Sequence, residues 1–352
     1  MKDFKIGSKK ISTNSNPFII AEISANHKKK IKNIFKAIDF VKANNLGALK
    51  LQTFEAQDIT LKSNDKKFKI QNYFKNKDWN NRTLYDLYEE AALPLNYYKK
   101  IFDYVKKKNV ICFSSIFSED KIKFLEKFNV PAYKIASLES LHFPLIEKVA
   151  KTNKPVLIST GTLLNEEIIE LIKFLKSLKN HKIIIMHCNT DYPVDLKKIN
   201  LAKINFLRKN SNFHLGFSDH SLGFNAAITS VSMGVVAIEK HIKISKNIKS
   251  LDSEFSLDLA DMKQYAININ EAWQTIGNYN YPQSKSEKFN KKFRRSVFFS
   301  KDIKKGEKII LNSLSIKRPL VGMCPSNIKK ILGKRAIKSF KKFTPVKKNY
   351  FF

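Results

Sequence analysis

Glycine, cysteine and acidic side chains are all scarce in this 352-residue sequence, and each shortage narrows what the protein can be. Only 10 residues are glycine, and no GxGxxG follows the first apolar run, which argues against a dinucleotide-binding fold. The three cysteines have no CxxC spacing, so neither a disulfide framework nor a zinc site is indicated. No apolar run reaches the roughly 18 residues that a membrane span requires, and residues 1–16 lack the apolar stretch of a signal peptide. We therefore expect a cytoplasmic protein without a membrane partner.

Acidic residues are outnumbered two to one, because 31 Asp and Glu face 65 Lys and Arg, for a formal net charge of +34. A charge of this size attracts nucleic acid, anionic membranes and phosphorylated substrates. However, Lys, Asn, Ile and Phe are abundant throughout, as A+T-rich coding would produce, and the lysines form no single basic arm. Compositional drift therefore accounts for the charge better than a dedicated polyanionic partner, and attraction of small anions follows as a by-product.

What the sequence does contain is a regular series of short patterns typical of buried strands. Continuous apolar and β-branched runs mark strands covered on both faces, as in a parallel sheet. Amphipathic stretches that suit helices lie between them, for example 33–45, 84–108 and 165–179. Eight such units within about 280 residues predict a closed (β/α)8 TIM barrel rather than an open doubly wound sheet. The eight runs are 18–23, 48–53, 110–115, 132–137, 155–160, 183–189, 214–220 and 236–241.

Each of these runs becomes polar at its carboxyl end. In a barrel the eight carboxyl ends meet on one face, where active sites are built. One polar residue there would often be only a strand cap, but together these ends supply lysines, hydroxyls, carboxylates and histidines. The sequence therefore predicts an enzyme site. The residues at these ends are Glu22, Lys50, Gln52, Ser114, Ser115, Lys134, Ser137, Ser159, Thr160, His187, Asn189, Ser218, Asp219, His220, Glu239 and His241.

The residue types at the strand ends indicate the chemistry. Lysines and hydroxyls suit a substrate with a phosphate and a carboxylate, although Lys50 or Lys134 could instead form a Schiff base. His220 and His241 end neighbouring strands, so they could hold one divalent ion with positions left open for substrate oxygens. The alternative is two histidines that are hydrogen-bonded separately. Glu22 could act as an acid or base, or it could be a buried ion-pair partner of a lysine.

The composition changes after a last helical pattern at about 258–277. The following stretch, 278–292, is polar and lysine-rich with one proline, which predicts a linker. Residues 293–352 then show short strand patterns and turns that predict a small β-rich domain. This region is basic, but it has no stacking-aromatic or zinc pattern, so we expect no nucleic-acid partner. The predicted organisation is therefore a barrel over 1–277, the linker, and the C-terminal domain.

Ordered motifs along the chain resemble those of the sialic acid synthase family. They are AEISANH, LKLQT, YKIAS, LISTG, HCNTDYP, GFSDHSLG and IEKH. The tail, with SKDIKKGE, KRP and ILGK, resembles the SAF domain of that family, which is related to type III antifreeze proteins. The resemblance runs from about residue 4 to 348. It implies a transferase that condenses phosphoenolpyruvate with an acylated amino-sugar aldehyde to give a nine-carbon nonulosonic acid and phosphate.

The resemblance also implies a role for each group. Glu22 would lie near the reacting carbon and the attacking water, and His220 and His241 would hold a divalent metal, Mn²⁺ or Mg²⁺, that polarises the aldehyde. Phosphoenolpyruvate would be held by Lys50, Ser115, Lys134, Ser137, Ser159, Thr190 and Ser218. The sugar would be contacted by Gln52, Tyr192 and Asp252. The resemblance further implies a domain-swapped homodimer, in which Arg318 and Phe293 would reach the sugar site of the partner subunit.

Within the family, the stretches KIASLE, LDSEFSLD and TLYDLYEEA are more similar to pseudaminic acid synthases than to other members. The implied acceptor is 2,4-diacetamido-2,4,6-trideoxy-L-altrose, and Phe255 near the pocket would suit its 6-deoxy methyl group. N-acetylneuraminate or legionaminate synthesis by the same mechanism is the alternative. Two segments depart from the family pattern: Lys28–Lys30 replace a small, Gly-containing segment, and Lys249–Leu251 replace Gly-Gly-Pro before Asp252. The altered loop stiffness could shift Asp252 and the sugar preference.

Two other functions are alternatives to nonulosonic acid synthesis. A barrel enzyme that joins phosphoenolpyruvate to a sugar phosphate, such as those making deoxy-octulosonate, would have an extra basic pocket and no antifreeze-like tail, so the tail argues against it. A non-catalytic protein that binds anionic polymers would be expected to lose the strand-end residues. Glu22, Lys50, Lys134, His220 and His241 are nevertheless all present.

Overall fold

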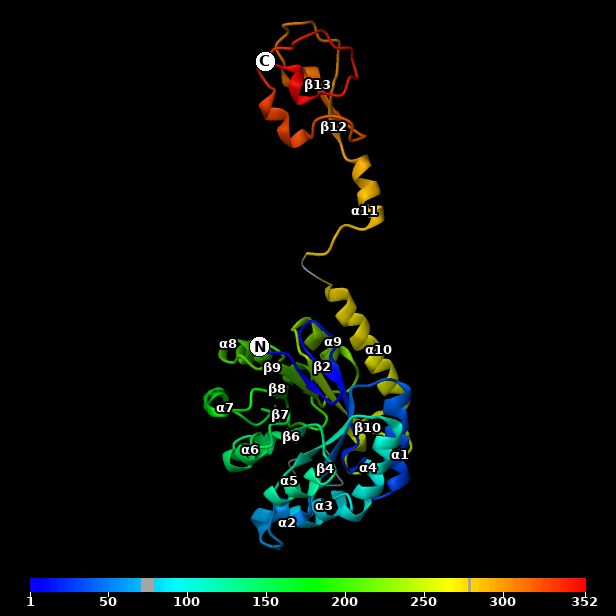
Figure 1. Ribbon diagram of the computed structural model, residues 1–352, viewed down its shortest axis with the longest axis vertical. Coiled ribbons are helices and arrows are strands. Elements are labelled where there is room, and N and C mark those ends of the chain that lie inside the picture. Colours follow the sequence, from blue (N-terminus) through cyan, green and yellow to red (C-terminus); the bar gives the residue numbers. More distant parts are fainter. Residues whose placement is uncertain (71–78, 278–279) are drawn as a thin grey trace. The chain divides into compact units, whose positions relative to one another are not determined.

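The computed structural model describes residues 1–70, 79–277 and 280–352. The chain divides into two compact units, Met1–Ile276 and Gly277–Phe352 (Figure 1).

The first unit is a closed barrel of eight parallel strands, which confirms the predicted TIM barrel. Each strand pairs with the next along the chain, and the last pairs with the first, where His241 lies beside Glu22. Glu22 in turn lies beside Lys50 on the second strand, so the register alone brings these three side chains together. The strands are β3 (Phe18–Glu22), β4 (Ala48–Thr53), β5 (Cys112–Ile116), β6 (Tyr133–Ile135), β7 (Val156–Ser159), β8 (Ile183–Cys188), β9 (His214–Asp219) and β10 (Ala237–Lys243).

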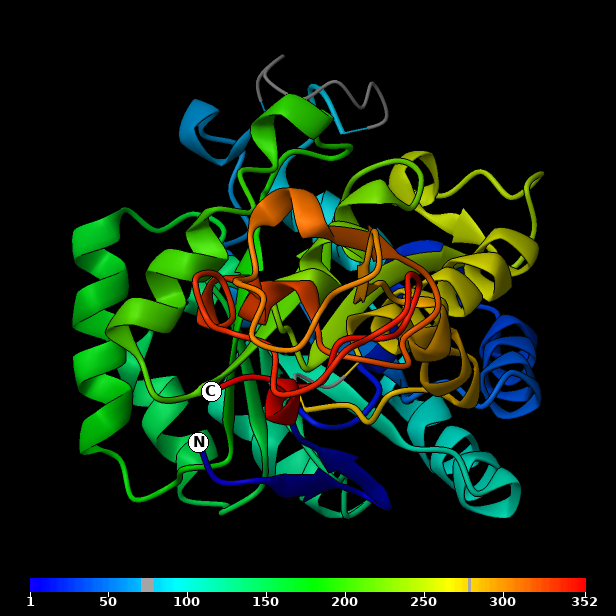
Figure 2. The same ribbon diagram turned by 90° about the horizontal axis from the view of Figure 1, so that it is seen from above.

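Helices cover the outside of the strands (Figure 2). The helical pattern at 84–108 is interrupted near Pro94, because proline removes a backbone donor and restricts the residue before it. The stretch therefore holds two helices, one on each side of Pro94. The helices are α1 (Ile31–Ala43), α2 (Ala56–Ile59), α3 (Leu84–Ala91), α4 (Tyr98–Lys108), α5 (Glu119–Glu126), α6 (Phe143–Ala150), α7 (Asn165–Ser177), α8 (Lys203–Asn210), α9 (Asn225–Ser232) and α10 (Leu259–Ile276).

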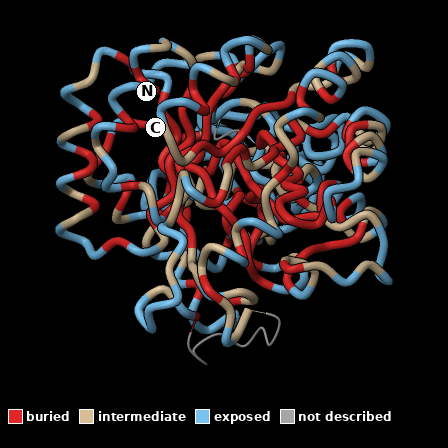
Figure 3. Tube along the Cα trace, turned by 90° about the horizontal axis from the view of Figure 1, so that it is seen from below, coloured by how far each residue is buried: buried red, intermediate tan, exposed pale blue. Residues whose placement is uncertain are grey.

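Two apolar cores hold the barrel. The larger lies between the strands and the helices, and the smaller fills the interior, so the strands are buried on both faces (Figure 3). A hairpin of β1 (Phe4–Ile6) and β2 (Lys9–Ile11), which the sequence patterns did not predict, contributes Ile6 and Ile11 to the interior core. Since this core includes Ala48 and Ala237 at the start of their strands, it closes the amino-terminal end of the barrel. The carboxyl end is left for polar side chains.

The second unit has little regular structure. Its strands β12 (Ser296–Phe299) and β13 (Leu314–Lys317) pair antiparallel, and isolated bridges and short 3₁₀ turns make up most of the rest. A helix, α11 (Lys285–Asn290), lies within the stretch predicted as a linker. The core of the second unit consists of ten buried apolar residues, including Val297, Phe299 and Phe340. Among the described residues of the whole chain, no helix is long and apolar enough to cross a membrane.

Candidate active site

A cavity of about 640 Å³ opens at the carboxyl ends of the barrel strands. All eight strands contribute at least one lining side chain. The barrel residues to which the family resemblance gave a role all line this one cavity: Glu22, Lys50, Gln52, Ser115, Lys134, Ser137, Ser159, Thr190, Tyr192, Ser218, His220, His241 and Asp252. Of the other strand-end residues, Glu239 also lines it, whereas Ser114, Thr160, His187, Asn189 and Asp219 do not. The convergence follows from parallel strands, whose carboxyl ends share one face.

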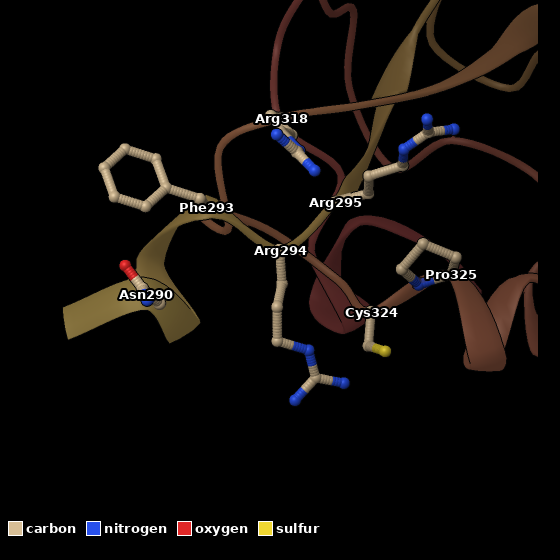
Figure 4. A pocket seen from close by; sticks show the side chains of 7 residues that line it. All are labelled: Asn290, Phe293, Arg294, Arg295, Arg318, Cys324 and Pro325. Carbon is tan, nitrogen blue, oxygen red and sulfur yellow. The ribbon is translucent and has the colours of Figure 1, made fainter. Parts of the chain in front are cut away.

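The two remaining predicted residues, Phe293 and Arg318, belong to the second unit. There they line a pocket of about 640 Å³ together with Arg294, Arg295 and Cys324 (Figure 4). Their predicted approach to the sugar site of a partner subunit stays a prediction.

Glu239 on β10 is the centre of the polar cluster. Its carboxylate oxygens lie 2.8 Å from Lys50 Nζ and 2.8 and 2.9 Å from Lys134 Nζ, and Oε1 accepts a 2.9 Å hydrogen bond from Ser218 Oγ. Burial opposes ionisation of this carboxyl, but the two lysines outweigh it and hold the pKa of Glu239 well below its usual range. The pattern Glu239-x-His241 could have revealed it, because alternate strand residues face the same side. Glu239 was among the predicted strand-end residues, but no local pattern shows that it pairs with both lysines.

Glu22 is the second buried carboxyl of the cluster. It lies 2.9 Å from Lys50 Nζ and 3.3 Å from His241 Nε2, and it accepts a 2.8 Å hydrogen bond from Gln52. The ion pair with Lys50 is the alternative weighed for this residue, and it forms here. Burial, reinforced by the Glu239 carboxylate, nevertheless raises the pKa of Glu22 in spite of Lys50. A carboxyl with a raised pKa inside a cavity is suited to exchange a proton.

The two lysines are both held by Glu239, yet their environments differ. The neighbouring carboxylates raise the pKa of Lys50 against the effect of burial, whereas burial wins at Lys134 and lowers its pKa. Both Nζ atoms are engaged in ion pairs, which gives charged point donors rather than a free amine of the kind a Schiff base needs. This arrangement suits the binding of an anion.

Hydroxyl groups complete the anion-binding side of the cavity. Ser159 Oγ is buried and has no hydrogen-bond partner among the described residues, and Ser137 Oγ accepts a 3.0 Å hydrogen bond from the Gly161 N–H. A buried polar atom without a partner costs about 1–3 kcal/mol. A ligand oxygen would satisfy Ser159, so this hydroxyl is suited to bind a polar group.

His220 and His241 lie next to each other, with ring centroids 5.2 Å apart. His220 Nδ1 lies 2.6 Å from the Asn189 carbonyl oxygen, so this nitrogen donates and Nε2 is left to bind a metal. His241 Nδ1 is buried without a partner among the described residues, and burial followed by the His220 charge holds the pKa of His241 well below its usual range. Burial opposes the charge on His220, but the charge and hydrogen bond of Cys188 outweigh it and raise the pKa of His220. A divalent ion held by the two histidines, beside the Glu22 carboxylate, would therefore have to displace the His220 proton. No group of three or more His, Cys, Asp or Glu side chains in the described ranges already has metal-site geometry.

Cys188, at the end of β8, is a lining residue that the sequence patterns did not single out. Its Sγ lies 3.8 Å from His220 Nδ1. Burial disfavours the thiolate, but the His220 charge and hydrogen bond outweigh it and lower the pKa of Cys188. The Cys188 thiol and the Asn189 carbonyl therefore both help to fix the orientation of the His220 ring. No CxxC or other spacing could have indicated this contact.

The remaining wall of the cavity is apolar. Tyr192 packs against His220 and Phe255, with ring centroids 4.3 and 4.8 Å apart. Phe54 packs edge-on against Tyr88 and Phe117. The same wall includes Ile70, Leu84, Leu87 and Leu251. A substrate bound here therefore meets methyl and aromatic groups as well as cations and hydroxyls.

Asp252 lines the cavity in spite of the altered loop before it. Its carboxylate accepts hydrogen bonds from Ser24 Oγ and from the Ala25 N–H, the latter at 3.2 Å. Burial raises the pKa of Asp252 more than these hydrogen bonds lower it. The carboxyl is thus fixed by the segment that follows β3 and can accept a hydrogen bond from a sugar.

Comparison with known proteins shows the family of this chain. The NeuB family model matches residues 37–281, and the SAF domain model matches 294–350. A pseudaminic acid synthase of Campylobacter jejuni is 35% identical over 94% of this chain and 95% of its own length. An N,N'-diacetyllegionaminic acid synthase of the same strain is 29% identical over 92% and 96%.

A solved structure of a spore coat polysaccharide biosynthesis protein E from Chromobacterium violaceum superposes with a TM-score of 0.77 at 21% identity, and it covers 96% of this chain and 99% of that one. At that identity the likeness shows the fold. The resemblance predicted from the motifs is confirmed: this chain belongs to the NeuB family, and its second unit carries an SAF domain.

Proposed function

We propose that this protein is a nonulosonic acid synthase that condenses phosphoenolpyruvate with an acylated amino-sugar aldehyde and releases phosphate. The observation that carries the proposal is the Lys50–Glu239–Lys134 cluster beside the orphan Ser159 hydroxyl and the His220–His241 pair, all in one cavity. The cations and hydroxyls suit the phosphate and carboxylate of phosphoenolpyruvate. The apolar wall suits an acylated sugar.

The reaction needs one new carbon–carbon bond and one broken carbon–oxygen bond. C3 of phosphoenolpyruvate adds to the aldehyde carbon, water adds at C2, and the tetrahedral intermediate expels phosphate. In this mechanism Lys50, Lys134 and Ser159 hold phosphoenolpyruvate, and Glu22 takes the proton from the attacking water. His220 and His241 would hold a divalent ion, whose chemistry when bound is to polarise the aldehyde oxygen.

The acceptor that we favour is the 2,4-diacetamido-2,4,6-trideoxy sugar of L-altrose type, so that the product is pseudaminic acid. Two observations support this choice. In the same Campylobacter strain, the pseudaminic acid synthase is more similar to this chain than the legionaminic acid synthase, at 35% against 29% identity. The apolar wall around Phe255 and Leu87 also suits a deoxy methyl and acetyl methyl groups better than hydroxyls. Legionaminate or N-acetylneuraminate synthesis is the alternative.

The first test is phosphate release with mass detection of the product. Purified protein receives phosphoenolpyruvate, Mn²⁺ and, separately, the altrose-type sugar, the legionaminic precursor and N-acetylmannosamine. We expect turnover of the altrose-type sugar alone, and its abolition by EDTA. Turnover of another sugar would keep the mechanism and move the specificity. Silence on all three sugars, from folded protein, would count against the proposal.

We further propose a homodimer in which Arg318 and Phe293 serve the sugar site of the partner subunit. This can be tested with two inactive variants, Glu22→Gln and Arg318→Ala, which are mixed under conditions that allow subunits to exchange. A heterodimer of the two has one intact site, so about a quarter of wild-type activity should return. If each site used its own Arg318, mixing would restore nothing.

A further inference from the structure

A second pocket, of about 470 Å³, lies beside the active-site cavity and has a cationic lining. Its cations come from three separate segments, and it contains one carboxylate. The cationic residues are Lys28, Lys29, Arg82 and Lys249, and the acidic one is Glu90. The segments Lys28–Lys30 and Lys249–Leu251 are those in which the chain departs from the family pattern, and the fold brings them together here.

The charges of this pocket are not balanced. Arg82 Nη2 lies 2.8 Å from Glu90 Oε2 and donates a 3.1 Å hydrogen bond to the Asp86 carbonyl, so Glu90 neutralises the guanidinium. No ion pair involves Lys28, Lys29 or Lys249 within the part of the chain that the structure describes. Three exposed lysines thus line one hollow, and the carboxylate of that hollow is paired with Arg82 rather than with them. In so basic a chain some lysines will gather by chance, so a second observation is needed.

That observation is the connection of this pocket to the acceptor side of the active site. Ala25 and Leu251 line both the pocket and the cavity. Hydrogen bonds also join the segment of Ala25 to the segment of Leu251, because the Asp252 carboxylate accepts from Ser24 Oγ and from the Ala25 N–H. Two more bonds join the same segments: Ser250 Oγ donates to Asn26 Oδ1 at 2.5 Å, and Asn26 Nδ2 donates to Ser256 Oγ at 2.8 Å. The lysines therefore flank the two short segments that fix Asp252.

We propose that this pocket binds the dianionic phosphate group of a small molecule, and that the bound phosphate changes the affinity for the acceptor sugar through Asp252. The coupling rests on the proposed function, whereas the binding does not. The phosphate could belong to a separate effector or to a phosphorylated acceptor that extends past Ala25 and Leu251. Three lysines that line a hollow of this size suit either source.

The test compares two double variants of equal charge. Lys28→Gln/Lys249→Gln removes two cations of the pocket, whereas Lys30→Gln/Lys32→Gln removes two exposed lysines that line neither cavity. Binding of inorganic phosphate, cytidine monophosphate and N-acetylmannosamine 6-phosphate is measured by titration calorimetry at 0.15 M NaCl. We expect the pocket variant to bind at least one probe about tenfold more weakly than the control variant. Equal affinities for all three probes would overturn the proposal.

Kinetics then separate the two sources. A free effector should change KM for the unphosphorylated acceptor several-fold and leave KM for phosphoenolpyruvate unchanged, and this effect should vanish in the pocket variant alone. Turnover of the sugar phosphate, reduced in the pocket variant, would assign the phosphate to the acceptor. Binding differences without turnover of any sugar would support the site and count against the proposed function. Turnover of a sugar without any difference in phosphate binding would support the proposed function and count against the phosphate site.

Discussion

The two units of this chain use charge in opposite ways. Gly277–Phe352 carries 21 Lys and Arg against 3 Asp and Glu, a formal charge of +18, whereas Met1–Ile276 carries 44 against 28, a formal charge of +16. More than half of the net charge thus belongs to the smaller unit. Yet the buried Lys, Asp and Glu side chains of the described residues all belong to the barrel. They are Glu22, Lys50, Lys121, Lys134, Asp219, Glu239, Lys240 and Asp258.

The comparison separates buried charges, which form the candidate active site, from exposed charges, which are solvated at the surface. In the barrel, oppositely charged groups are paired inside a cavity, where water screens them weakly and removing one partner leaves the other exposed to a low dielectric. In the second unit the buried polar residues are only Ser296 and Ser313 among those described, and the core is otherwise apolar. Its cations are solvated and act at long range.

The largest effect is expected from removing one carboxylate in each unit. Glu239→Gln leaves two buried lysines without their common partner, so we expect kcat/KM to fall about a thousandfold and the barrel to lose about 3–5 kcal/mol. Glu307→Gln removes a carboxylate that is 2.9 Å from Lys301 at the surface, so less than about 1 kcal/mol is expected. Urea unfolding followed by tryptophan fluorescence measures the loss in Glu239→Gln, since Trp79 and Trp273 both lie in the barrel, and trypsin cleavage within 277–352 at increasing urea measures the loss in Glu307→Gln. Similar losses in the two variants would break the comparison.

The next effect concerns the apolar core of the second unit. Phe299 is fully buried and stacks on Phe340 with ring centroids 5.1 Å apart. Phe299→Ala should lower the free energy of unfolding of the second unit by about 3–5 kcal/mol. A core of ten buried residues stabilises a small domain by little more than this amount. We expect rapid cleavage by trypsin within 277–352, where lysines are dense, and an unchanged urea midpoint of tryptophan fluorescence. A parallel fall of that midpoint would mean that the two units unfold together.

The third effect is a response of the barrel to acid. Burial, followed by the Lys29 charge, lowers the pKa of His27 from 6.5 to about 4. Between these values the unfolded chain binds the proton and the folded chain does not, so stability is lost as pH falls through this window, by about 3 kcal/mol at its lower end.

The second unit contains no histidine, so its stability should stay level as pH falls from 7 to 5. Its carboxyls Asp302 and Glu307 have pKa values lowered by backbone and lysine hydrogen bonds, and they titrate below that window. Tryptophan fluorescence at pH 7 and 5 follows the barrel, and trypsin sensitivity follows the second unit. Burial raises the pKa of Glu139 to about 7, so its protonation stabilises the barrel over the same pH range in both proteins. The His27 assignment therefore predicts that the wild-type midpoint falls relative to that of His27→Gln between pH 7 and 5, and an equal pH dependence in the two proteins would contradict it.

The smallest effect is that of salt. Exposed charges of one sign repel each other over a screening length of about 10 Å at 0.1 M salt. Raising NaCl from about 0.05 to 0.5 M should therefore stabilise the second unit, by less than about 1 kcal/mol, or a few degrees in Tm. The barrel, whose charges are more nearly balanced, should shift less. Calorimetry at both salt concentrations measures this, and a larger shift of the barrel would reverse the comparison.

The sequence predicted the barrel because its signal was local and repeated. Each predicted strand matches an observed one to within about two residues at its start, since continuous burial leaves a continuous apolar run. The lining residues of the cavity were predictable for the same reason, because strand ends converge. The β1–β2 hairpin was missed, since two three-residue strands leave almost no pattern.

Contacts between distant segments were also beyond the sequence. Nothing local tells that Glu239 meets both Lys50 and Lys134, because that depends on the width of the barrel and on which side chains face inward. Nor does any pattern tell that Ser250 bonds to Asn26 and so brings two lysine-bearing segments around one hollow. Such pairs depend on tertiary geometry, which periodicity does not encode.

The register of β3 with β10 has a consequence for how the protein is made. Phe18 lies beside Ala237, so the first and last strands of the barrel join across about 220 residues. On a ribosome that adds about 5–20 residues per second, the first strand waits roughly 10–40 s for its partner. During that interval its apolar edge is open to wrong neighbours. A lower growth temperature or additional chaperone should therefore change the yield of folded protein more than the loss of any single contact in the finished barrel.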